Sequence, residues 1–139
     1  MKSNTVQIST QETKNRLSTL WIFIMINMAF ADIIGFMYPG ALAKIVAGMP
    51  IDGTVITPSL LLVGALLLEI PTTMIVISRF LKYGVNRWFN IVAAFITIVY
   101  VAGMGTPTVV YWFFCSLEIL ACLVIIVMSI RWRKSENEI

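Results

Sequence analysis

Four long apolar stretches constrain the fold of this chain more than any other feature. They cover about residues 17–38, 58–80, 87–104 and 107–130. A helix of about 20 apolar residues crosses the hydrocarbon core of a bilayer, which is about 30 Å thick. A helix also satisfies its backbone hydrogen bonds within its own segment, as the interior of a bilayer requires. The sequence therefore predicts an all-α integral membrane protein, built as a single four-helix transmembrane bundle with short loops.

The composition agrees with a membrane protein and excludes several classes of function. Only 12% of the residues are charged and 59% are hydrophobic, whereas about 25% of a soluble domain is charged. The net charge of +3 comes from short basic runs beside the apolar stretches. Such runs are not the footprint of a nucleic-acid-binding protein. We expect the lipid bilayer as the surrounding partner and no nucleic acid.

The sequence predicts neither a cofactor nor a metal site. The chain has no His, and His is the usual haem ligand, zinc ligand and proton shuttle. Its two cysteines, Cys115 and Cys122, lie seven residues apart in one apolar stretch. That spacing is about 10 Å along a helix, which is too far for a mutual disulfide. We interpret both as small buried side chains.

The connections carry recognisable turn and cap signals. The longest is the loop 39–57, in which a short interfacial helix can follow Gly40. Asp52 and the glycine after it form a dipeptide typical of a tight hairpin turn. Thr57 is a candidate N-cap, because a proline follows it at the first helical position. Asn86 is a candidate N-cap for the third stretch.

Basic residues predict the orientation in the membrane, because Lys and Arg gather on the cytoplasmic side. If both termini are cytoplasmic, Lys44 is the only basic residue on the outer side. The other nine are then cytoplasmic: Lys2, Lys14, Arg16, Arg79, Lys82, Arg87, Arg131, Arg133 and Lys134. We therefore expect a multi-pass protein of the cytoplasmic membrane with both termini inside.

Acidic residues within the apolar stretches are the most informative feature for function. Glu69 and Glu118 lie about 16 Å from the outer ends of their helices, and Asp32 about 10 Å. Asn27 lies at about 18 Å, close to the level of the two glutamates. An ionised side chain at a helix centre costs roughly 2.5–3.5 kcal/mol on insertion scales. Since no Lys or Arg lies at these depths, some of the carboxyls are protonated, or a cation or donor group lies between them. The structural alternative is that protonated carboxyls join the helices by hydrogen bonds.

The surroundings of Glu69 favour it as the centre of a site. Pro71 lacks a backbone donor, so the carbonyl of Leu67 loses its helical partner and the helix gains a candidate hinge. Thr72 and Thr73 follow Glu69 by three and four residues, which places them on its face of the helix. The predicted site for a substrate or a proton therefore comprises these residues together with Asn27, Asp32 and Glu118.

Several short motifs carry a resemblance to known proteins. They are Leu17–Phe23, Phe30–Ile33, Met37–Gly40, Glu69–Pro71, Ser78–Tyr83 and Asn86–Trp88. Together they resemble a family of small four-span prokaryotic membrane proteins of unknown function, which implies the inner membrane of a prokaryote and supplies no activity. The segment from Gly64 to Glu69 is more loosely similar to the second span of DoxX-like proteins. Small multidrug transporters resemble the chain in size and span count, but their key Glu lies in the first span, where this chain has Asp32.

These observations leave three functional hypotheses open. The leading one is proton-linked transport of a small cationic or lipophilic solute by a homodimer, in which Glu69 exchanges the proton, Glu118 tunes it and Asp32 forms the outer access. The second is a pocket for a sterol-like, quinone or other lipophilic ligand, with acid catalysis by Glu69 or Glu118. No nucleophile or cofactor motif supports catalysis. The third is an accessory subunit whose carboxyls pair with a partner's intramembrane Lys or Arg.

Overall fold

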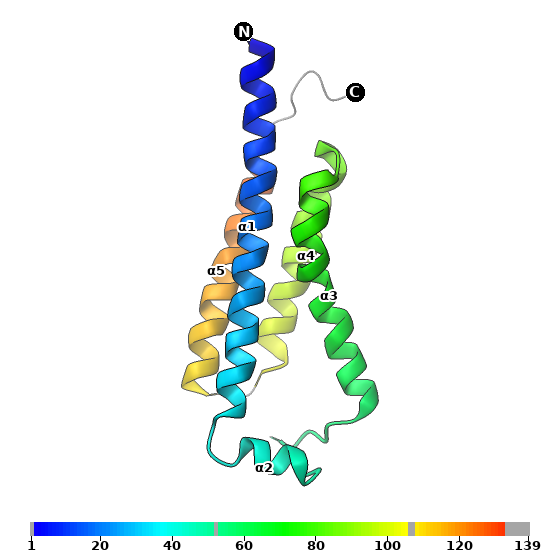
Figure 1. Cartoon of the computed structure of the whole chain (residues 1–139), viewed down its shortest axis with the longest axis vertical. Helices are drawn as coiled ribbons and strands as arrows, with labels where there is room; N and C mark the ends of the chain where they lie inside the picture. The colour runs from blue at the N-terminus through cyan, green and yellow to red at the C-terminus, as the bar shows by residue number, and fades with distance from the viewer. Residues whose placement is uncertain (1, 52, 106–107, 133–139) are drawn as a thin grey trace.

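The fold is an up-and-down bundle of four long helices with a short helix across one end. The computed structural model describes residues 2–51, 53–105 and 108–132, with side chains from residue 10 onward. The helices are α1 (Lys2–Phe36), α2 (Ala41–Val46), α3 (Pro58–Phe80), α4 (Tyr83–Gly103) and α5 (Val109–Arg131) (Figure 1). All except α2 are long and apolar enough to cross a membrane. The predicted all-α four-helix membrane fold is confirmed.

The four long helices form a closed ring. Helix α1 packs against α3 and α5, and α4 packs against the same two helices from the other side. The contact between α3 and α4 is the least extensive of the four, and α3 leans away from the bundle towards α2 (Figure 1). In the most apolar window of α3 only 11% of the residues are buried inside the molecule, against 33% in each of the other three helices. Helix α3 is therefore the least covered span.

The two ends of the bundle differ in charge. The basic end, where α1 enters and α5 leaves, carries Lys14, Arg16, Arg79, Lys82, Arg87 and Arg131. The opposite end, called the loop end below, comprises residues 37–51 and 53–57 and the described residues between α4 and α5, and it carries Lys44. Exposed apolar side chains cover the surface between the two ends, as a surrounding bilayer requires.

Two helix boundaries differ from the sequence prediction. Helix α1 begins at Lys2 instead of near residue 17, because the polar segment before the span is also helical. Glu12 and Arg16, one turn apart, form an exposed ion pair in that extension. Helix α4 begins at Tyr83, so Asn86 lies inside the helix and is not its N-cap.

The predicted cap before α3 is present. The side chain of Thr57 accepts a hydrogen bond from the Leu60 amide at 3.2 Å, and Pro58 is the first helical residue. In the preceding loop, the backbones of Ile51 and Thr54 exchange two hydrogen bonds of 2.9 Å. Gly53 has a φ of +81°, which suits the tight turn that was expected here. The predicted turn residue Asp52 and the predicted start of the fourth span, Pro107, lie outside the described residues.

A buried polar network ties three helices together at the basic end. Trp21 of α1 donates its indole N–H to Asn90 of α4 at 2.8 Å, and Ser78 of α3 donates to the same Asn90 oxygen at 3.3 Å. The Asn86 amide nitrogen donates to the Ser78 carbonyl at 2.6 Å. Ser18 of α1 donates to the Ile75 carbonyl at 2.7 Å and accepts from the Arg79 side chain. Ser18, Trp21, Ser78, Asn86 and Asn90 are all fully buried, and below they are called the basic-end network.

Candidate functional site

A cavity of about 450 Å³ opens at the loop end of the bundle. Its walls come from α1, α2, α4, α5 and the turns between them, with one residue from α3. Among a mostly apolar lining, the ionisable side chains are those of Asp32, Tyr38, Lys44, Tyr100, Tyr111 and Glu118. The cavity, called the loop-end cavity below, therefore brings residues from distant parts of the chain into one polar site.

Glu118 is the most deeply buried carboxylate of the loop-end cavity. Its side chain lies on α5 between Cys115 and Cys122, which are one turn away on either side and fully enclosed. Only 3% of Glu118 is exposed, and within the described residues its Oε1 atom has no hydrogen-bond partner. A buried polar atom without a hydrogen-bond partner lowers the stability of the folded protein, and a buried ionised carboxylate lowers it far more. This oxygen therefore has an unused acceptor position in a residue that lines the cavity.

Asp32 lies one level closer to the mouth of the same cavity. It is on α1 one turn after Met28, which is buried in the core and also lines the cavity. This spacing of four residues keeps Asp32 on the inward side of α1, while its carboxylate stays exposed to the cavity. Asp32 and Glu118, from opposite ends of the sequence, therefore face one common space.

Tyr111 forms an aromatic wall of the cavity. Its hydroxyl donates a hydrogen bond to the Val101 carbonyl of α4. The ring lies against Gly105, and a Cβ at that position would overlap the ring. Helix α5 is capped just before Tyr111, because the Thr108 hydroxyl accepts a hydrogen bond from the Tyr111 amide at 3.1 Å. A glycine and a capped helix start therefore place the ring at the mouth.

Lys44 adds a positive charge to the same site. It lies on α2, which crosses the loop end, and it lines the cavity that holds Asp32 and Glu118. Within the described ranges it forms no ion pair with either carboxylate. The sequence placed Lys44 alone at the outer edge of the membrane. The structure adds that Lys44 lines the cavity of the two carboxylates, because α2 crosses the loop end.

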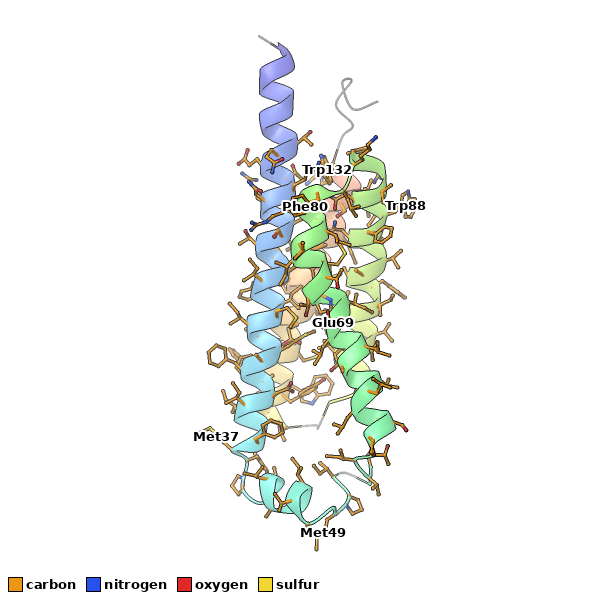
Figure 2. The ribbon with its side chains drawn as sticks, turned by 45° about the vertical axis from the view of Figure 1, so that its right-hand side comes forward. Met37, Met49, Glu69, Phe80, Trp88 and Trp132 are labelled. Atoms are coloured by element: carbon orange, nitrogen blue, oxygen red, sulfur yellow. The ribbon has the colours of Figure 1, made fainter. Side chains whose placement is uncertain are left out.

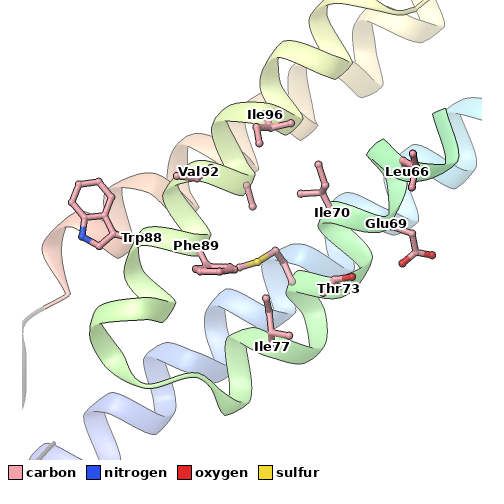
Figure 3. A pocket seen from close by; sticks show the side chains of 11 residues that line it. Leu66, Glu69, Ile70, Thr73, Ile77, Trp88, Phe89, Val92 and Ile96 are labelled. Atoms are coloured by element: carbon pink, nitrogen blue, oxygen red, sulfur yellow. The ribbon is translucent and has the colours of Figure 1, made fainter. Parts of the chain in front are cut away.

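Glu69 lies outside the loop-end cavity. It is exposed, near the middle of the long axis of the bundle, with the labelled Phe80 and Met49 towards opposite ends (Figure 2). It borders a lateral groove of about 480 Å³ between α3 and α4, whose lining is almost entirely apolar. The Glu69 carboxylate points away from Trp88 and Phe89 on the opposite wall (Figure 3). The structure therefore separates Glu69 from Asp32 and Glu118.

The two threonines after Glu69 point in different directions, contrary to the expectation of one shared face. Thr73 is exposed and lines the groove beside Glu69. The Thr72 hydroxyl donates to the Leu68 carbonyl at 2.8 Å and contacts the Met25 sulfur of α1 at 3.5 Å. Thr72 and Thr73 lie on either side of Glu69 on the helix surface, and the contact with α1 takes the Thr72 hydroxyl away from it.

The two remaining predicted residues line neither space. Pro71 is buried, and α3 continues through it from Pro58 to Phe80. Asn27 is buried and donates to the Phe23 carbonyl of its own helix at 2.8 Å. Its role in the described structure is local, and its predicted place beside the carboxylates is not supported by the cavity lining.

Sequence reasoning missed Lys44, Tyr100 and Tyr111 as site residues. Tyr100 and Tyr111 both lie near the ends of their helices, close to the level of Asp32, and they line the same cavity. Counting residues from the outer helix ends would have placed Asp32, Tyr100 and Tyr111 at similar levels. The position of Lys44 depends on how the loop after α1 folds, and no spacing in the sequence reveals it.

A metal centre has little support in this site. Among the residues that the structure describes, no group of three or more Cys, Asp and Glu side chains could hold a metal ion. Cys115 and Cys122 are free and buried. The site therefore offers two carboxylates, an amine and phenol rings, which suit a proton, an organic cation or a ligand with hydrogen-bond donors.

Comparison with known proteins identifies a family and no activity. The sequence model of a family of unknown function, DUF6326, matches residues 6–138, which is nearly the whole chain. No curated protein and no solved structure matches the chain.

Proposed function

Because the chain belongs to the DUF6326 family, whose function is unknown, we propose its function from the geometry of the site: proton-linked movement of a small cationic or lipophilic solute through the loop-end cavity. The observation that carries this proposal is the buried Glu118, whose Oε1 atom has no partner and which shares the cavity with Asp32. A carboxyl in this position binds either a proton or a cation. This competition couples the movement of the proton to the movement of the cation.

The residues of the cavity have distinct roles in the proposal. Glu118 holds the exchanged proton at the closed end, and Asp32 attracts the cation at the mouth. The rings of Tyr100 and Tyr111 offer π-faces to a cation, a contact that is worth roughly 0.5–2 kcal/mol. Lys44 competes with the solute for the carboxylates. This assignment moves the proton exchange from Glu69, favoured by the sequence, to Glu118.

The proposal includes an orientation in a membrane. We place the basic end in the cytoplasm and the loop-end cavity on the opposite side, because Lys and Arg gather on the cytoplasmic side. The resemblance described above suggests the cytoplasmic membrane of a prokaryote. A C-terminal fluorescent-protein fusion should then fluoresce, whereas an alkaline phosphatase fused at the same point should stay inactive.

Proton flux in liposomes tests the proposal directly. The purified protein is reconstituted into vesicles that contain a pH-sensitive dye, and quaternary ammonium cations from tetramethylammonium to benzyltrimethylammonium are added outside. We expect cation-dependent proton efflux from the wild type and at least a roughly tenfold loss in Glu118→Gln, because the amide cannot exchange a proton.

Glu69→Gln is the matched control, since it makes the same change on the other acidic face. The proposal expects this variant to keep most of the flux. Loss of flux in Glu69→Gln with retention in Glu118→Gln would return the exchange to Glu69. Absence of cation-dependent flux from the folded wild type would contradict the transport proposal. Thermal unfolding should show that both variants fold, because neither glutamate makes a side-chain hydrogen bond in the described part of the chain.

A second candidate function rests on the groove between α3 and α4. Its apolar walls, including Trp88 and Phe89, suit a lipophilic ligand that enters from the bilayer. A native mass spectrum of the protein released from mild detergent distinguishes this candidate. A discrete bound lipophile that is lost in Phe89→Ala would favour ligand binding over transport, and an unliganded protein would favour transport.

A further inference from the structure

Helix α3 exposes a regular stripe of side chains on its outer surface. The stripe consists of Leu62, Leu66, Glu69, Thr73, Val76 and Phe80, at alternating intervals of four and three residues. All six are exposed, from 56% for Val76 to 79% for Phe80 among the apolar members. We propose that this α3 stripe is the interface of a homodimer in which two copies of α3 pack in parallel. The inference does not depend on the activity of the loop-end cavity.

The spacing of the stripe suits another helix. Intervals of four and three residues average 3.5, the repeat that keeps a seam of side chains facing a second helix in a left-handed pair. Ala65 borders the seam beside Leu66 and is exposed. A small residue at this place lets two helix backbones approach closely, which is how helices associate in a bilayer.

The polar residues of the stripe indicate what covers it. Lipid chains can cover the apolar members but offer nothing to the carboxyl of Glu69. Within the described residues no side chain forms a hydrogen bond or an ion pair with Glu69, and its carboxylate is turned away from the groove wall (Figure 3). An intramembrane acid in this position requires a polar partner at the same depth.

A second copy of the chain supplies that partner by symmetry. All copies insert in one orientation, so a two-fold axis normal to the membrane brings each Glu69 to the level of Glu69 in the other copy. A protonated carboxyl has one donor and further acceptor sites, so two identical carboxyls satisfy each other. The hydroxyl of Thr73, one helical turn away, is a further donor on the same seam.

Disulfide cross-linking in native membranes tests the interface. Cysteine is introduced at Leu62 or Val76 on the stripe and, as matched controls, at the equally exposed Val99 of α4 or Val127 of α5. Because Cys115 and Cys122 are buried, the wild type gives the background. We expect a dimer after mild oxidation for Leu62→Cys and Val76→Cys, and no increase over background for the controls. Equal cross-linking at all four positions, or cross-linking of the stripe to a different protein, overturns the proposal.

Variants of Glu69 test the polar contact. In a dimerisation assay in detergent, Glu69→Leu should weaken association roughly fivefold, because an interhelical hydrogen bond of about 1 kcal/mol is lost. Glu69→Gln keeps a donor and an acceptor, so its dimerisation constant should stay close to that of the wild type. Tighter or unchanged association of Glu69→Leu, or a monomeric wild type in membranes, contradicts the inference.

Discussion

The basic-end network and Glu118 at the loop end differ in how their buried polar groups are hydrogen-bonded, although Arg87 and Ser129 near the basic end also have an unpartnered side-chain atom within the described part of the chain. At the basic end Trp21, Ser78 and Asn90 are buried and bonded to one another across three helices. At the loop end Glu118 is buried almost as completely, yet its Oε1 atom has no partner in the described residues, and a cavity of about 450 Å³ lies beside it. Partnered polar groups hold helices together, whereas an unpartnered one is kept at a cost in stability.

The difference between Asn90 and Glu118 indicates which buried polar groups can take part in function. The amide of Asn90 is both donor and acceptor, so neighbouring helices can satisfy it completely. A carboxyl changes between an acceptor and a donor as it loses or gains a proton, so a fixed set of partners suits only one of its states. The loop-end cavity leaves Glu118 room for both states, and the basic-end network leaves no such freedom.

The largest effect on stability is expected from Asn90→Ala. This change removes the acceptor of Trp21 and Ser78 and breaks the contact with Asn86. Stranding buried donors should lower the free energy of unfolding by roughly 2–4 kcal/mol. Thermal unfolding in detergent measures this loss. Asn27→Ala is the control, because Asn27 is also buried but bonds only to its own helix, and it should cost less than about 1 kcal/mol. Equal losses would show that the network does not couple the helices.

A smaller loss is expected from Gly105→Ala at the loop end. The new methyl group would overlap the Tyr111 ring, so the ring must move and its hydrogen bond to the Val101 carbonyl breaks. Overpacking of this kind costs roughly 1–3 kcal/mol. Gly103→Ala is the matched control, since a Cβ there meets nothing within 4 Å. A normal unfolding temperature in Gly105→Ala would mean that this wall of the cavity adapts freely.

The next prediction concerns binding at the loop end and leaves stability unchanged. Lys44→Gln removes the positive charge that lines the cavity with Asp32 and Glu118. Its loss should strengthen the binding of a quaternary ammonium cation roughly three- to tenfold, which corresponds to about 1 kcal/mol of repulsion. Isothermal titration measures the change. Lys82→Gln at the basic end should have no effect, and equal gains in both variants would point to net charge instead of the site.

The smallest effect is expected from Arg16→Gln, beyond the basic-end network. Arg16 pairs with Glu12 one turn earlier, and both side chains are more than half exposed. Exposed pairs at this spacing contribute only about 0.3–0.5 kcal/mol. Thermal unfolding at low and high salt should barely distinguish the variant from the wild type. A loss as large as that of Asn90→Ala would shift the origin of stability from the buried network to the surface of α1.

The sequence predicted the fold more fully than the site. Four apolar stretches of membrane-spanning length were enough to predict the all-α bundle. The Thr57 cap could be predicted because the residues that form it are close together in the sequence. Acidic residues inside the spans were equally visible. Their depth follows from counting residues, but the direction of each side chain depends on how its helix is rotated, and that rotation is set by packing.

Glu69 and Glu118 show where that limit lies. Both stand at similar depths in apolar helices, and the polar neighbours Thr72 and Thr73 favoured Glu69 as the centre of the site. The packing of α5 against α1 and α4 turns Glu118 inward, while the weak contact of α3 with α4 leaves Glu69 on the surface. Hydrophobicity along the chain determined that this protein spans a membrane and carries three intramembrane acids. Which of them share a cavity depends on the tertiary structure, because long-range packing between helices, and not the spacing within one helix, sets which side chains meet.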